Sequence, residues 1–216
     1  MKKIAVLFLS IIAVAVLQGT AAAQTDNTQT FVSARIGLQN QGATYHLLEV
    51  FQTRGKWIVP DVGYIDFADA RDYREIFIGG GAVLYSSERF TVIEEVYLNQ
   101  ACGPASGGAA YLMPWSLLGF KITPKLGGEA VYFPYLPLNK AGRIQHVLER
   151  VKLEYGLTHF KIGGGYGAYQ FGDGPWQNKP FVTATIKGGR FGNLELWLQR
   201  TPTNKAQLQV QYVRAF

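Results

Sequence analysis

Apolar and polar residues alternate along most of the chain, and the pattern is clearest at its C-terminal end. Read with a period of two, residues 205–216 separate into an apolar set and a glutamine set: Ala206, Leu208, Val210, Tyr212 and Phe216 against Gln207, Gln209 and Gln211. Successive side chains of a β-strand point to opposite faces. The pattern therefore predicts a strand with one apolar face and one uncharged polar face.

The same alternation, broken by turn-forming residues, divides the chain from residue 30 onward into about twelve strands. The predicted strands are 30–39, 43–53, 56–67, 73–85, 90–99, 109–122, 128–137, 143–155, 158–171, 180–187, 193–201 and 205–216. Pro60 lies inside the third strand and indicates a bulge, because proline cannot donate to the strand ladder. If residues 43–67 are irregular instead, the number of strands falls to ten.

Residues 143–155 are compatible with two structures. Four apolar residues have the spacing of an amphipathic helix: Ile144, Val147, Leu148 and Val151. In the second half, apolar and charged residues alternate as in a strand: Val151, Leu153 and Tyr155 against Arg150, Lys152 and Glu154. Because of this alternation we interpret the segment as a strand, with the helix as the alternative.

The N-terminus has the three parts of a secretory signal peptide. Lys2 and Lys3 are followed by an apolar run from Ile4 to Leu17 and then by small residues up to Ala23. An uncleaved N-terminal anchor is the competing interpretation, although the run is short for a spanning helix. We expect cleavage after Ala23, which divides the chain into a signal peptide, a short leader and one barrel domain: 1–23, 24–29 and 30–216.

Composition supports an all-β chain. Glycine is abundant, with 25 residues, and aromatic residues make up 13% of the sequence. Removal of the signal peptide lowers the basic count from 21 to 19 against 15 acidic residues, so the net charge falls from +6 to +4. This mild charge neither requires nor excludes an acidic ligand. Cys102 is the only cysteine and cannot form an internal disulfide.

The two ends of the chain together resemble Gram-negative outer-membrane β-barrel proteins. The C-terminal strand of these proteins typically ends in Phe with apolar or aromatic residues at alternate positions, as Phe216 and Tyr212 do here; Arg214 departs from that pattern. The resemblance implies an outer-membrane location with lipid around the wall. It also implies that this strand closes the barrel and that Tyr212 and Phe216 form the signal for the barrel-assembly machinery.

The expected fold is thus a single antiparallel transmembrane β-barrel, because no apolar run after the signal peptide could span a bilayer as a helix. With the N-terminus in the periplasm, the two longest loops, 100–108 and 172–178, fall on the outer side, and the inner turns are short. In size and strand number the chain looks like the small monomeric porins that admit acidic oligosaccharides. No diagnostic motif of those porins is matched, so no ligand residue is carried over.

Polar residues on the inward phase of the strands are the candidates for lining a pore. They are Arg35, Arg150, Lys152, Glu154, Lys161, Lys187, Glu195, Gln207, Gln209 and Gln211. One interpretation is a passive channel for small solutes, whose basic residues favour anions. The other is a closed barrel with a structural or surface-binding role, in which charges of opposite sign pair across the lumen.

Evidence for catalysis or cofactor binding is weak. The histidines His46, His146 and His159 have no converging metal-ligand spacing, and we expect no metal and no cofactor. The glycine runs 79–81 and 163–165 do not complete a phosphate-binding pattern, and we attribute them to close packing inside a barrel. Ser116 with His146 or His159 leaves a lipid-acting barrel enzyme as a further alternative. Dispersed basic residues without a recognisable module give no indication of nucleic-acid binding.

Two features concern the outer wall. Glu94 and Glu95 are strand neighbours and should point to opposite faces, so one would meet lipid unless it lies near the periplasmic rim. Aromatic residues near the predicted strand ends suggest interfacial girdles: Trp57, Tyr64, Tyr85, Tyr97, Trp115, Tyr155, Trp176 and Tyr212.

Overall fold

The computed structural model describes residues 28–39, 42–67, 73–201 and 205–216; the expected signal peptide, 1–23, lies outside the described residues. Within them are two short 3-10 turns, η1 (Pro104–Ser106) and η2 (Gly189–Phe191), and twelve strands. The strands are β1 (Thr28–Gln39), β2 (Gly42–Arg54), β3 (Trp57–Phe67), β4 (Tyr73–Ser86), β5 (Phe90–Cys102), β6 (Ala110–Lys121), β7 (Leu126–Pro137), β8 (Gln145–Gly156), β9 (Phe160–Phe171), β10 (Gln177–Lys187), β11 (Asn193–Arg200) and β12 (Ala206–Ala215). No helix in this part of the chain is long and apolar enough to span a membrane.

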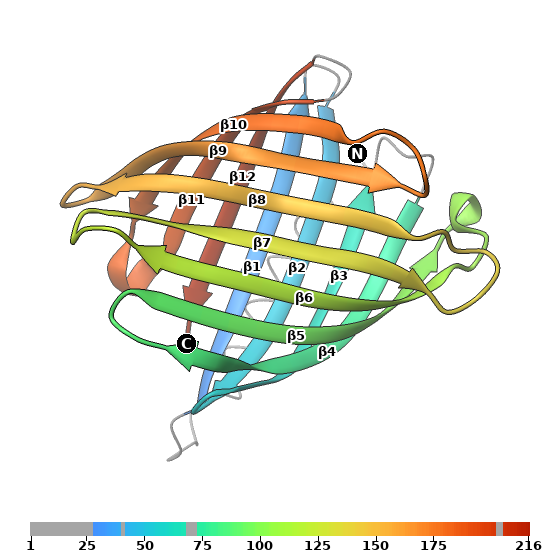
Figure 1. The fold of residues 1–216 in the computed structure, drawn as a ribbon, viewed down its shortest axis with the longest axis horizontal. Coiled ribbons are helices and arrows are strands. Elements are labelled where there is room, and N and C mark those ends of the chain that lie inside the picture. Colours follow the sequence, from blue (N-terminus) through green and yellow to red (C-terminus); the bar gives the residue numbers. More distant parts are fainter. Residues whose placement is uncertain (1–27, 40–41, 68–72, 202–204) are drawn as a thin grey trace.

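The twelve strands form one closed antiparallel barrel in which each strand pairs with its sequence neighbours. β1 pairs with β12 from Phe31 opposite Ala215 to Leu38 opposite Leu208, which closes the sheet on itself. In Figure 1, β4 to β10 form the near wall, and β11, β12 and β1 to β3 form the far wall. The predicted all-β barrel of about twelve strands is confirmed. The ten-strand alternative is wrong, because residues 43–67 form the paired strands β2 and β3.

The connections that follow the even-numbered strands from β2 to β10 all lie at one end of the barrel. We call this the turn end; it holds the connections 55–56, 87–89, 122–125, 157–159 and 188–192. At the opposite end, the loop end, are the longer connections 103–109 and 138–144. Figure 1 shows the turn end at the left and the loop end, with η1, at the right. The C-terminus lies at the turn end.

The strand pairing shifts at several places, and two of these bulges place charged residues inside the barrel. The first falls between Ile58 and Asp61 on β3, where Pro60 predicts it. The second lies on β8, where the pairing shifts between Leu148 and Val151 and leaves Glu149 as an extra residue. A bulge of this kind lets two successive residues of one strand oppose a single residue on the partner. It also explains the helix-like spacing of Leu148 and Val151, because both lie on the outer face of a strand.

Polarity is inverted relative to a soluble protein. Carboxylates and a lysine are buried in the interior, including Asp61, Glu75 and Lys152 at 2%, 3% and 4% exposure. Large apolar side chains stand exposed on the outer face, such as Ile78, Leu98 and Val182. Soluble proteins seldom expose so continuous an apolar surface. The outer wall is therefore suited to lipid, and the interior has the polar character typical of outer-membrane barrels.

Glu94 and Glu95 point to opposite faces, as expected. Glu95 is buried inside and accepts a hydrogen bond from the Tyr97 hydroxyl at 2.9 Å. Glu94 lies on the outer face, a few residues from the turn end of β5, and accepts from the Ser116 hydroxyl at 2.6 Å. The expected girdles need one correction. Tyr97 and Trp115 face the interior rather than the lipid, because they share the inward phase of Glu95.

Glycines allow neighbouring strands and inward rings to approach each other closely. A Cβ on Gly165 would lie 2.2 Å from the carbonyl oxygen of Val151 and 2.7 Å from the Phe181 ring. A Cβ on Gly79 would lie 2.5 Å from the Tyr97 ring. The two glycine runs therefore make room for bulky interior side chains, in agreement with the packing explanation.

Candidate functional site

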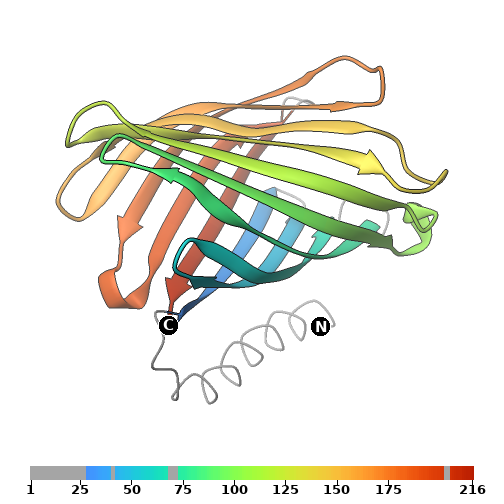
Figure 2. The same cartoon turned by 60° about the horizontal axis from the view of Figure 1, so that its bottom comes forward.

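A network of charged side chains crosses the barrel interior. We call it the central ion network; its members are Arg35, Glu129, Glu149, Arg150, Lys152, Glu154 and Glu195. Arg35 on β1 donates to Glu149 on β8. Between these strands lie four others on one side of the barrel and six on the other. Figure 2 shows the two walls facing each other. The contact therefore joins nearly opposite walls and narrows the lumen.

Glu149 is held between two arginines. One of its carboxylate oxygens accepts from Arg35, and the other accepts from Arg150. Arg35 also donates to the amide oxygen of Gln211 at 2.9 Å, and Arg150 also donates to Glu129. Because of the β8 bulge, Glu149 and Arg150 both point inward although they are sequence neighbours.

Lys152 lies at the turn-end side of this network and is surrounded by carboxylates. Its ammonium is 2.6 Å from Glu195, 3.2 Å from Glu129 and 3.5 Å from Glu154. Its side chain is only 5% exposed. A buried ammonium is tolerated only when charged partners replace its hydration shell, and here three strands supply them.

Two stacked aromatic rings lie beside the cations of the central ion network. The rings of Trp197 and Phe181 are stacked with centroids 4.6 Å apart. Arg35, Arg150 and Lys152 lie 5.5, 5.8 and 5.6 Å from the Trp197 ring centre, which is within cation–π range. The Trp197 ring thus lies against all three positive charges.

Toward the loop end the interior is filled by an aromatic plug. Its buried residues are Ile65, Phe77, Tyr97, Ala101, Ala109, Tyr111, Met113 and Tyr135. Glu75 lies within it and accepts hydrogen bonds from Tyr73 at 2.7 Å and Tyr135 at 3.1 Å. The Tyr97 hydroxyl contacts Asp61 at 2.8 Å as well as Glu95. Tyrosine hydroxyls therefore donate to all three of these carboxylates.

At the turn end the interior opens into a hollow of about 280 Å³. We call it the turn-end hollow; its charged lining residues are Lys121, Lys125, Glu129, Glu154, Lys161 and Lys187. The hollow meets the central ion network through Glu129 and Glu154, which belong to both. Its four lysines against two glutamates make its wall basic on balance. An anion arriving from this end would meet attractive charge before the narrow part of the lumen.

The predicted pore residues separate into three groups. Arg35, Arg150, Lys152, Glu154 and Glu195 meet in the central ion network, and Gln211 joins it through Arg35. Lys161 and Lys187 lie at the turn-end hollow, where the Lys187 ammonium donates to the Leu157 carbonyl at 2.7 Å. The remaining two lie nearer the loop end in a chain of amides, where Gln207 contacts Thr44, Gln199 and Gln209.

Sequence reasoning missed five of the interior acids: Glu49, Asp61, Glu75, Glu129 and Glu149. For Glu75 the signal was available, because it shares the inward phase of Phe77, opposite to that of the apolar residues Ile76 and Ile78. For Asp61 and Glu149 the phase is set by a bulge, which alternation alone does not locate.

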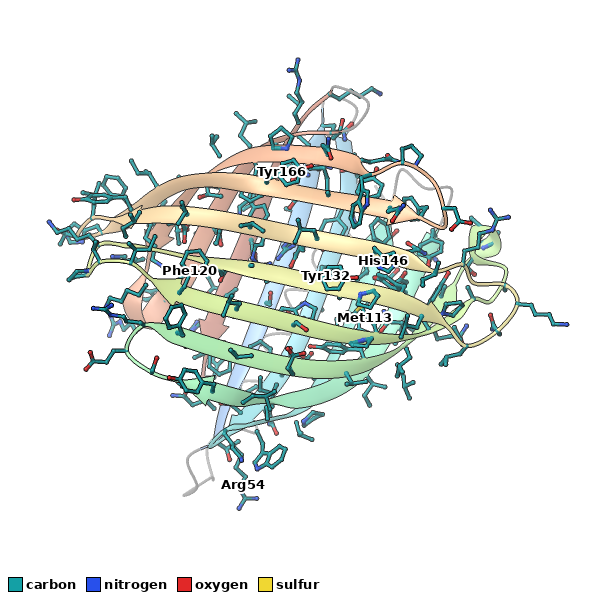
Figure 3. All side chains as sticks on the ribbon, viewed as in Figure 1. Arg54, Met113, Phe120, Tyr132, His146 and Tyr166 are labelled. Carbon is teal, nitrogen blue, oxygen red and sulfur yellow. The ribbon has the colours of Figure 1, made fainter. Side chains whose placement is uncertain are left out.

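Of the residues considered for catalysis, Ser116 and His146 lie on the outer face and His159 lies in the turn 157–159. Ser116 bonds to Glu94, whereas the Nδ1 atom of His146 is 2.8 Å from the Tyr132 hydroxyl. Figure 3 shows Tyr132 and His146 side by side on β7 and β8. Among the described residues, no group of three or more His, Cys, Asp or Glu side chains is arranged to hold a metal ion.

Comparisons with known proteins give similarity of fold only. No protein-family model matches the sequence, and no curated protein matches it. Among solved structures, a KdgM porin superposes with a TM-score of 0.64 at 12% identity, over 86% of this chain and 99% of that one. A KdgM porin in complex with disordered oligogalacturonate matches with a TM-score of 0.62 at 12% identity over the same shares. The chain therefore has the fold of these small porins over nearly their whole length.

Proposed function

We propose that this protein is a narrow porin-like channel of the outer membrane for small solutes. The observation that carries the proposal is the polar lumen of a closed barrel, entered at the turn end through a basic hollow of about 280 Å³. The apolar outer wall and the fold shared with KdgM porins support it. In this proposal the turn end faces the periplasm and the predicted interior residues line the path.

We further propose that the channel prefers anions. Support comes from the four lysines of the turn-end hollow and from Arg35 and Arg150 at the narrow part. The KdgM complex holds oligogalacturonate, a chain of sugar acids, so a similar barrel accommodates an anionic solute. The many interior carboxylates act against this preference, and we expect it to be modest in the intact protein.

A closed barrel with a structural or surface-binding role is the second candidate. A specific observation favours it, namely the Arg35–Glu149 contact, which joins nearly opposite walls. The aromatic plug also favours a closed barrel, because it fills the interior at the loop end.

Liposome swelling separates the two candidates. Vesicles containing the refolded mature protein should swell in small neutral sugars at a rate that falls as the sugar grows, as expected for a narrow path. Swelling no faster than in protein-free vesicles, with the barrel shown to be folded and inserted, would favour the closed barrel.

We also propose that residues 1–23 are a cleaved signal peptide and that Tyr212 and Phe216 form the assembly signal. The backbone of Phe216 exchanges hydrogen bonds with Thr30 at 2.8 and 3.3 Å, so this residue takes part in closing the sheet. Expression of the full chain should give an outer-membrane protein that begins at Gln24. Deletion of Phe216 should sharply reduce the amount in that membrane; an unchanged amount would contradict the assembly role.

A further inference from the structure

We propose that Glu149 is an internal ligand that determines the specificity of this lumen, and that an anionic group of the solute must displace it from Arg35 and Arg150. The inference rests on the proposed channel but concerns one residue of its narrow part. Both oxygens of the Glu149 carboxylate are taken by guanidinium groups from two strands. Guanidinium pairs of this kind also recognise carboxylates and phosphates of ligands.

The surroundings of Glu149 suit exchange. Its side chain is 18% exposed, more than those of Arg35 at 10% and Arg150 at 12%. The arginines are fixed by other contacts, with Gln211, Glu129 and the Trp197 ring, and would keep their places without it. The Nε atom of Arg35 is buried and has no hydrogen-bond partner within the described ranges, so the arginine has a donor to spare.

The backbone also singles out Glu149. It is the extra residue of the β8 bulge and opposes no residue on β7 or β9. Without the bulge, strand alternation would place Glu149 and Arg150 on opposite faces. The bulge thus places the Glu149 carboxylate between Arg35 and Arg150. In a regular strand this position would be open to an anion from the solution.

The first test measures anion binding by the change in tryptophan fluorescence of the refolded mature protein, in which Trp197 is the tryptophan that lies against Arg35 and Arg150, with malonate as the probe at constant ionic strength. For E149Q we expect the half-saturating malonate concentration to fall about tenfold, because a competing full charge is removed from the site. The matched control E88Q removes a carboxylate from the exposed turn 87–89 and should bind as the wild type does. Equal half-saturation in wild type and E149Q, or equal tightening in E88Q, would overturn the proposal.

A second measurement separates this inference from the proposed function. In planar bilayers, E149Q should raise the chloride-to-potassium permeability ratio. The charge-neutral double variant R35Q/E149Q should raise conductance without that change, because it removes the contact but keeps the net charge. If E149Q binds malonate more tightly but none of the variants passes current, the proposed channel function is wrong and the anion-binding role of the two arginines is supported. If the channels conduct but E149Q changes neither malonate binding nor the permeability ratio, the role of Glu149 is wrong and the channel function is supported.

Discussion

Replacement of Lys152 by methionine should destabilise the barrel more than any other single charge removal in the lumen. Methionine keeps most of the side-chain volume but leaves Glu129, Glu154 and Glu195 without their shared cation, at 2.6 to 3.5 Å from its position. Breaking a buried ion pair from one side costs about 3–5 kcal/mol, because a charge is left buried and uncompensated. The free energy of unfolding by urea in detergent micelles measures the loss.

Lys161→Met is the matched control for this prediction. Lys161 approaches the same carboxylate, Glu154, but only to 3.9 Å, and its side chain is 44% exposed. Exposed pairs contribute at most about 1 kcal/mol, so this variant should unfold close to the wild type. Equal stability of the two variants would show that the three carboxylates do not depend on Lys152.

Replacement of Tyr135 by alanine should open the loop end of the lumen. Tyr135 is 7% exposed, packs edge-on against Tyr111 and donates to Glu75. Loss of a buried aromatic ring costs about 3–5 kcal/mol where the site cannot collapse. We expect a lower unfolding free energy together with a higher conductance, because the plug loses one of its buried rings.

Tyr166→Ala controls for the loss of a ring alone. Tyr166 lies on the outer face of β9, where its hydroxyl bonds to Asn178, and its side chain does not enter the lumen (Figure 3). The conductance of the Tyr166→Ala barrel should equal that of the wild type. A Tyr135→Ala barrel that is destabilised yet conducts no better than Tyr166→Ala would show that the plug does not limit passage.

The sequence predicts the architecture well because the outer wall repeats one rule on every strand. Leu198, Val182 and Ile162 each lie outward at alternate positions, so the phase of most strands follows from the apolar residues alone. The predicted strand ends differ by a few residues, as on β5, which extends to Cys102. Strand ends depend on hydrogen bonds with the neighbouring strand, and local patterns do not encode these.

The interior is less predictable for a different reason. Which charges pair across a lumen depends on the closure and tilt of the whole barrel, so the contact between Arg35 and Glu149 has no local signal. The inward position of Glu149 depends in addition on a bulge, and the sequence around it resembles a helix as much as a strand. The aromatic plug also has no local signal, because an aromatic residue such as Tyr97 is compatible with an outer girdle as well as with an inner core.

Single-channel recording of the refolded wild-type protein in a planar bilayer tests the central claim most directly. A narrow channel predicts small, stable conductance steps with reversal potentials that show a modest preference for anions. Protein that inserts and keeps its heat-modifiable folded form, but passes no current, would contradict the channel and leave a barrel closed by the Arg35–Glu149 contact and the aromatic plug.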